Sequence, residues 1–190
     1  MVSACLVGQP CRYDGRSNLR PEIAELVHCG LAVAVCPEVM GGLPTPRTPS
    51  EQKGGRVVAA DGRDVTAEFT AGAEAALYIA EECGCCAAVL KARSPSCGCG
   101  RIYDGTFSRT LIEGDGIFAS LLRKKGFELF TEETFVADEA ELAEARSRRP
   151  QQEAGGTDPG NAPESIEDAL AAILSGNVLE GFSITGADRS

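Results

Sequence analysis

The stretch "LAVAVCP", residues 31–37, decides the fold. Every residue before Cys36 is apolar, and Val33 and Val35 are also β-branched. A short apolar run without polar alternation is typical of a strand that is buried on both faces of a parallel sheet. We therefore expect a buried strand here and, with it, an α/β domain.

Strand and helix patterns alternate on either side of this run within residues 1–135. Three further apolar runs predict strands: "MVSACLV" (1–7), "CAAVLKA" (86–92) and "FELFTE" (127–132). Helical periodicity covers residues 20–29, 64–82 and 114–126. Such alternation implies crossover connections, so we expect a Rossmann-like parallel sheet of about four strands with helices on both faces.

Local signals mark the ends of these helices. Pro21 is well placed for a first helical turn, and Gly30 and Gly126 follow the last turns of their helices. Thr66 and Asp64 compete as the N-cap of the longest helix.

The last 55 residues differ in composition from the domain at 1–135. We expect a helical or flexible acidic linker over 136–163, because its second half is polar and rich in glycine and proline. Residues 164–190 predict a short amphipathic helix and a tail. An isolated helix of this length is marginal in water, so we expect it to dock on its own domain, on a second copy in a homodimer, or on another partner.

The net charge of −10 is spread unevenly. Residues 136–190 carry −7 and the first 135 residues only −3, with no basic stripe, so a nucleic-acid partner is not expected. No run approaches the length of a membrane span, and "MVSACLVG" is too short and uncharged for a secretory signal. We expect a cytoplasmic protein that does not associate with membranes.

Nine cysteines make up an unusually large share of the chain. Their odd number, in a cytoplasmic protein, argues against a disulfide framework and favours metal binding or chemistry. Cys29 and most of the "CGCC" run at 83–86 are more simply interpreted as small apolar residues.

Three cysteines follow strand ends. Cys5 ends the first expected strand, Cys36 ends the second, and Cys97 follows the third. The carboxyl ends of parallel strands share one edge of a sheet, where α/β proteins bind ligands. Three thiolates from three loops suit a soft metal centre, and their spacing does not resemble the close pairs of a zinc ribbon.

Polar residues surround these cysteines. Glu38 stands two residues after Cys36, and Ser94 and Ser96 flank Pro95 in the loop before Cys97. Arg12 and Tyr13 lie in the charged loop "CRYDGRS". By residue type alone, Glu38 could equally be a solvated carboxylate and Ser94 a turn residue.

Four motifs then occur in a fixed order: "SACLVGQPCRYDG" (3–15), "VCPEVMGGLPTPR" (35–47), "KARSPSCG" (91–98) and "IYDGTFS" (102–108). Together they resemble the thiouracil desulfidase family over about residues 2–135. The resemblance implies a 4Fe-4S cluster that is held by only three cysteines, at the positions of Cys5, Cys36 and Cys97. The fourth iron is then free to take the sulfur of a thiolated pyrimidine.

The resemblance further implies a non-redox desulfuration that releases hydrogen sulfide from thiouracil or a thiouridine-type compound. It assigns the acid/base and orienting roles to Glu38 and Ser94, and we expect Arg12, Tyr13 and Ser96 to contact the substrate. An iron with an open position acts as a Lewis acid towards a soft sulfur, and a nearby carboxylate can serve the attacking water.

Cys11 and Cys99 leave an alternative open. A fourth thiolate from either residue would close the cluster and give a fully ligated iron–sulfur or zinc protein with a structural, metal-storage or redox-sensing role. Cys97 is the expected ligand of its pair, and Cys99 is expected to be a neighbouring or buried thiol.

Overall fold

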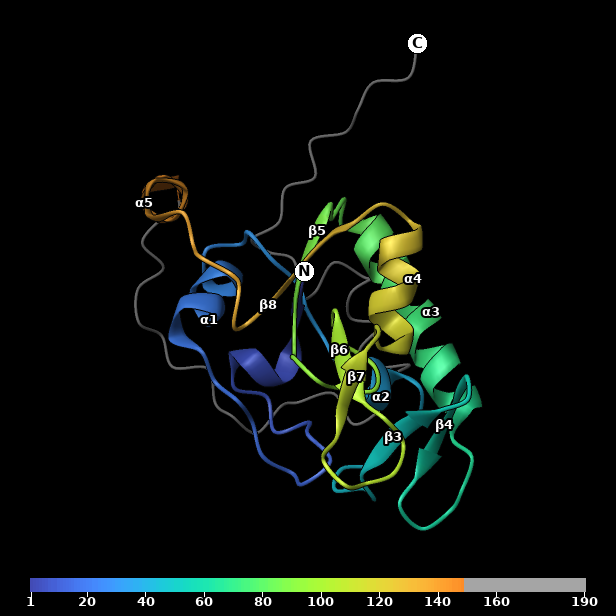
Figure 1. The fold of residues 1–190 in the computed structure, drawn as a ribbon. Helices are drawn as coiled ribbons and strands as arrows, with labels where there is room; N and C mark the ends of the chain where they lie inside the picture. Colours follow the sequence, from blue (N-terminus) through green and yellow to red (C-terminus); the bar gives the residue numbers. More distant parts are fainter. Residues whose placement is uncertain (149–190) are drawn as a thin grey trace. The chain divides into compact units, whose positions relative to one another are not determined.

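The computed structural model of this protein describes residues 1–148. A parallel sheet lies at its centre, made of β1 (Val2–Ser3), β2 (Ala34–Val35), β5 (Ala87–Leu90) and β8 (Glu128–Thr131), in the order β2-β1-β5-β8 (Figure 1). The expected α/β fold with a parallel sheet of about four strands is therefore confirmed.

Helices cover both faces of this sheet (Figure 1). On one face, Ile23 of α1 (Pro21–His28) packs in a cluster with Val2 and Val89. On the other, Leu90 packs with side chains of α3 (Thr66–Glu82) and α4 (Ile117–Lys124). Val89 and Leu90 point to opposite faces because strand side chains alternate, and both are buried since each face has a helix above it.

The helix signals act much as expected. Pro21 occupies the first turn of α1, and Gly30 and Gly126 adopt positive φ values of 74° and 84° beyond their helices. At the start of α3, the carboxylate of Asp64 accepts a hydrogen bond of 3.0 Å from the Thr66 backbone N–H. Asp64 thus provides the hydrogen-bond acceptor for the first N–H group of α3, although Val65 occupies the N-cap position.

Two strands are much shorter than expected. β1 ends at Ser3, and residues Ala4–Val7 form the 3-10 helix η1, which Gly8 closes at a φ of 99°. β2 contains only Ala34 and Val35, because Pro37 begins α2 (Pro37–Met40) directly after Cys36. Leu6 is as fully buried in η1 as Val2 is in β1, so the apolar run marks burial rather than strand conformation.

Two antiparallel hairpins were not expected from the sequence. They consist of β3 (Ser50–Lys53) with β4 (Arg56–Ala59), and β6 (Arg101–Tyr103) with β7 (Leu111–Glu113). Gln52 of β3 donates 3.0 Å hydrogen bonds to the carbonyls of Pro95 and Asp115. This hairpin therefore braces the loop that leads to Cys97.

The described chain ends with α5 (Glu139–Arg148), within the segment where a helical or flexible linker is expected. Leu142 and Ala145 are buried, and Arg146 Nε lies 2.8 Å from the Glu25 carboxylate of α1. The helix expected after residue 164 lies outside the described residues, so the proposed domain boundaries stay a prediction. Within residues 1–148, no helix has the length and apolarity needed to span a membrane.

Candidate active site

A cavity of about 630 Å³ lies at the carboxyl ends of the parallel strands. Ser3 and Cys5 reach it from β1 and η1, Cys36 from the end of β2, and Lys91 from the end of β5. Parallel pairing brings these segments to one edge of the sheet, although they are far apart in the sequence.

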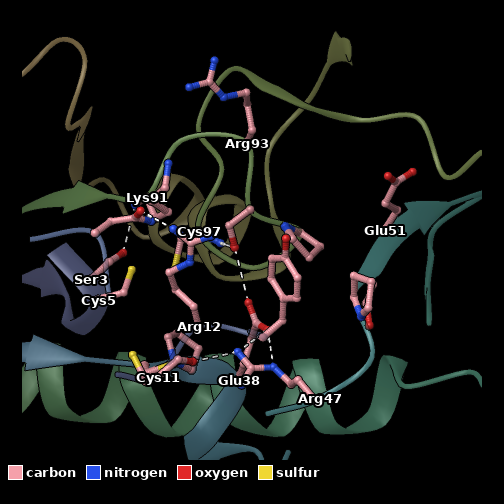
Figure 2. Close-up of a pocket in the computed structure, with 18 of the residues that line it drawn as sticks. Ser3, Cys5, Cys11, Arg12, Glu38, Arg47, Glu51, Lys91, Arg93 and Cys97 are labelled. Carbon is pink, nitrogen blue, oxygen red and sulfur yellow. Dashed lines mark hydrogen bonds and ion pairs between the residues drawn. The ribbon is translucent and has the colours of Figure 1, made fainter. Parts of the chain in front are cut away.

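Four thiols line this cavity: Cys5, Cys11, Cys36 and Cys97. Cys5 and Cys97 are buried, and Figure 2 shows them with Cys11 on the same side of the cavity. Cys36 Sγ lies 3.9 Å from the carbonyl oxygen of Cys11. The three cysteines that were expected to converge do so, and Cys11 joins them.

Burial and mutual proximity raise the pKa values of three of these thiols, those of Cys11, Cys36 and Cys97. Loss of solvation raises the pKa of Cys97 to about 12. The pKa of Cys36 is raised far above its usual value by its hydrogen bond with Cys11 and by burial. Cys36 lowers the pKa of Cys11, but contact with Cys5 and burial outweigh this effect and bring it to about 11. A metal that binds these three sulfurs must displace their protons.

The donor set is of the kind that holds an iron–sulfur cluster, because cysteine thiolates are the usual ligands of such clusters. Among residues 1–148, no group of three or more His, Cys, Asp or Glu side chains has the spacing to enclose one metal ion.

A buried hydroxyl beside Cys97 supports the same fit. The Ser96 Oγ atom is buried and makes no hydrogen bond within the described part of the chain. The Ser96 and Ser3 hydroxyls both lie close to the Cys97 thiol and act to lower the pKa of Cys97, against the larger effect of burial. Such a hydroxyl is free to donate to a ligating sulfur, a contact that is typical of iron–sulfur sites.

Glu38 stands on the wall of the cavity in a network of hydrogen bonds. α2 begins immediately after Cys36, so its first turn holds Glu38 close to that thiol. Arg47 binds the Glu38 Oε2 atom through Nε at 2.9 Å and Nη2 at 2.8 Å. Figure 2 shows Glu38 beside Arg47, and the Ser94 hydroxyl donates a longer bond of 3.4 Å to Oε1.

Ser94 also organises the loop of Cys97. Its Oγ atom accepts hydrogen bonds of 3.1 Å from the backbone N–H groups of Ser96 and Cys97. Its single proton points to Glu38. One hydroxyl therefore connects the carboxylate with the segment that carries a thiol.

Arg12 and Tyr13 both line the cavity, as a contact with substrate requires. Asp14 holds the Arg12 guanidinium through two hydrogen bonds of 3.1 and 3.0 Å, and the guanidinium carbon lies 5.9 Å from the centre of the Tyr13 ring. The Arg47 backbone N–H donates to the Tyr13 carbonyl at 2.8 Å. Their contact with substrate stays a prediction.

Ser96 and Cys99 do not line the cavity. Ser96 is fully buried and does not line the cavity, because its carbonyl accepts N–H groups from the start of α4 at Phe118 and Ala119. The expected contact of Ser96 with substrate is therefore not supported by its position and stays a prediction. Cys99 also lies off the cavity wall, and its sulfur is 3.1 Å from Nη2 of Arg123.

Sequence reasoning gave no role to several charged residues that line the cavity, among them Arg47 and Lys91. Arg47 closes the second motif and Lys91 opens the third, so both stood in quoted stretches without a role. Lys91 pairs with Glu132, whose other carboxylate oxygen accepts the Ala92 N–H at 2.7 Å. The partner of Arg47 lies 9 residues away and the partner of Lys91 lies 41 residues away, so local sequence patterns could not reveal either pair.

These features define a class: an α/β protein whose parallel sheet presents a cluster of buried thiols and a paired carboxylate to one cavity. A family model described as 2-thiouracil desulfurase matches residues 1–134. The chain belongs to that family, as its motifs led us to expect.

The chain is also similar to two known proteins. One is a protein of Bacillus subtilis (strain 168) described as "Uncharacterized protein YbbK", which is 42% identical over 142 residues, 70% of this chain and 94% of that protein. The other is a solved structure, the 4Fe-4S-dependent thiouracil desulfidase TudS, with 49% identity and a TM-score of 0.68 over 77% of this chain and 95% of that one.

Proposed function

We propose that this protein removes sulfur from thiouracil-type pyrimidines in a non-redox reaction that depends on a 4Fe-4S cluster and releases hydrogen sulfide. Family membership and the similarity to TudS support this function. The observation that carries it is the meeting of Cys5, Cys36 and Cys97 in one cavity, beside a carboxylate that is fixed by Arg47.

We assign Cys5, Cys36 and Cys97 as the three ligands. The bound cluster supplies an iron that acts as a Lewis acid towards a soft thiocarbonyl sulfur. The protein contributes a buried site in which two ligands are shielded from solvent and a third lies at the start of a helix.

Glu38 is the proposed acid/base residue. Its Oε1 atom carries only the long bond from Ser94, whereas Oε2 is occupied by Arg47, so Oε1 is the oxygen available to a water or a ring nitrogen. Ser94 orients this oxygen relative to Cys97, and Arg12 and Tyr13 are placed to contact the pyrimidine.

Anaerobic reconstitution tests this function. The protein should bind iron and acid-labile sulfide, consume the thiocarbonyl absorbance of thiouracil and release sulfide. Cys5→Ala should lose the iron, whereas Glu38→Gln should keep it and lose at least about a hundredfold in kcat. A fully loaded protein that turns over no thiopyrimidine would exclude the proposal.

A second candidate, a fully ligated cluster without catalysis, rests on Cys11. This thiol adjoins both Cys36 and Cys5 and could supply a fourth ligand. Cys11→Ala distinguishes the two functions: a desulfidase keeps its iron, and a fully ligated protein loses it. Cys86→Ala removes an exposed thiol away from the cavity and is the matched control.

We expect the substrate to be a free base or nucleoside, and the reaction to be cytoplasmic. The net charge of −3 over residues 1–135, without a basic stripe, gives a polynucleotide little to bind. Comparing turnover of thiouracil, thiouridine and thiolated RNA at two salt concentrations tests this expectation. Turnover of the RNA that falls steeply with salt would contradict it.

A further inference from the structure

The loop at residues 104–110 joins β6 to β7 and borders the cavity. It contains most of the "IYDGTFS" motif, which has no role in the function proposed above. Phe107 and Arg109 of this loop line the cavity.

The backbone of this loop adopts an uncommon conformation. Within the described chain, the non-glycine residues with positive φ are Arg93, Phe107 and Arg109, at 63°, 59° and 65°. All three line the cavity. Side chains rarely adopt this left-handed region, and such residues gather at functional sites where the surrounding structure holds them.

Glu51 of β3 holds the loop. Its buried carboxylate oxygen Oε2 accepts hydrogen bonds from the backbone N–H groups of Gly105 at 3.0 Å and Phe107 at 2.9 Å. A side chain at Gly105 would lie 2.5 Å from the Gln52 carbonyl, so the loop backbone packs directly on β3. Figure 2 places Glu51 on the opposite side of the cavity from Cys5.

The hydrogen bonds from the loop to Glu51, which we call the Glu51 clamp, hold the Phe107 ring in an exposed position. Phe107 is 39% exposed, although a ring of its size gains free energy from burial. Arg93 does not compete for the same ligand, because its guanidinium pairs with Glu133 and points away from Glu38 and Cys97 (Figure 2). The loop therefore offers an apolar, planar surface to the cavity.

We propose that Phe107 stacks on the pyrimidine ring of the substrate, and that Glu51 is the positioning residue that holds Phe107 there. This inference rests on the proposed function, since it names the wall that recognises the ring in the same cavity. Stacking suits a flat heteroaromatic substrate and leaves its sulfur free to face the thiols on the other side.

Phe107→Ala and Phe107→Leu test the stacking in the cluster-loaded protein. The quantities to measure are kcat and KM for thiouracil, and the dissociation constant of uracil, which lacks the sulfur. We expect both KM and this dissociation constant to rise about 5- to 100-fold in Phe107→Ala, less in Phe107→Leu, with a smaller change in kcat. Tyr78→Ala removes a 53% exposed ring on α3, away from the cavity, and should change neither.

The clamp is tested by coupling. Glu51→Ala should raise KM, as Phe107→Ala does, and should speed hydrogen exchange at the N–H groups of Gly105 and Phe107. In the double variant, in which Phe107 is already alanine, Glu51→Ala should raise KM little further. Equal losses in both backgrounds would show that Glu51 does not act through Phe107. Glu51→Gln retains an acceptor oxygen and should recover part of the affinity.

Failure of this inference is distinct from failure of the proposed function. An active Phe107→Ala variant with unchanged KM overturns the stacking and leaves the desulfidase function intact. If the wild-type protein turns over no thiopyrimidine, the uracil dissociation constant still decides, because equal values in wild-type and Phe107→Ala overturn the stacking.

Discussion

Arg47 and Glu38 form an ion pair in the wall of the cavity, with Nη2 and Oε2 2.8 Å apart and the two side chains only 6% and 15% exposed. The same Nη2 atom lies 3.0 Å from the Cys11 carbonyl oxygen. One guanidinium thus fixes both the proposed acid/base carboxylate and the loop beside the thiols.

Replacing Arg47 should lower both the stability of the protein and its kcat. Arg47→Met leaves a largely buried carboxylate without its partner, which costs about 3 kcal/mol or more of the free energy of unfolding, and we expect kcat to fall at least about tenfold. Arg47→Lys keeps the charge but loses the planar fork, so it should recover only part of kcat. Urea unfolding and steady-state kinetics measure the two effects.

Arg63→Met is the matched control for Arg47. Arg63 pairs with Asp61 in an exposed turn outside the cavity, so neither kcat nor the unfolding midpoint should change measurably. A loss of kcat as large as that of Arg47→Met would show that the effect does not come from Glu38.

Gly72 controls the contact between α2 and α3. A Cβ atom at this position would lie 1.8 Å from the Pro37 carbonyl oxygen. Helix propensity alone predicts that Gly72→Ala stabilises the protein by about 1 kcal/mol. We expect the opposite, a destabilisation of about 1–3 kcal/mol and a loss of activity, because α2 carries Glu38 and must move away. Chemical unfolding gives the sign, and Ala71→Gly at an exposed position of α3 reports the propensity term by itself.

Glu132 should make the protein sensitive to acid. Burial works to raise its pKa, but hydrogen bonds from Lys91 and the Ala92 N–H, together with the Lys91 charge, outweigh burial and lower it below 4.5. A lowered pKa contributes stability that is present above pH 4.5 and is lost as the pH falls through the folded value.

Unfolding midpoints between pH 7 and pH 3 measure this contribution. In Glu132→Gln the midpoint should already be lower at pH 7 and should fall less on acidification than in the wild type. Glu81→Gln breaks an exposed pair with Lys125 and serves as the control. A wild-type midpoint that falls no more steeply than that of Glu132→Gln would contradict the prediction.

Removal of residues 149–190 should leave catalysis intact, because every residue assigned to the site lies between 3 and 132. If the expected C-terminal helix joins two copies, the shortened protein should be monomeric where the full chain is dimeric. Sedimentation at matched concentrations, together with turnover of thiouracil, measures both. A dimer that survives the truncation would exclude dimerisation through this segment.

The sequence by itself determined the layered α/β fold, because apolar runs and helical periodicity record which residues must be buried. It also brought Cys5, Cys36 and Cys97 to one edge, because the carboxyl ends of parallel strands share that edge whatever the strand lengths. It did not give the lengths: β1 and β2 stop after two residues, because the 3-10 helix η1 follows β1 and α2 begins at Pro37 directly after Cys36.

Only the tertiary structure decided which polar groups meet. Arg47 with Glu38, Lys91 with Glu132, and Glu51 with the Phe107 loop are contacts between segments that no local period links. The burial of Ser96 is likewise decided by the tertiary structure, in which its carbonyl accepts hydrogen bonds from the start of α4. Hydrophobic patterns repeat along the chain and can be read from it, whereas a hydrogen bond depends on the direction of two side chains that only packing fixes.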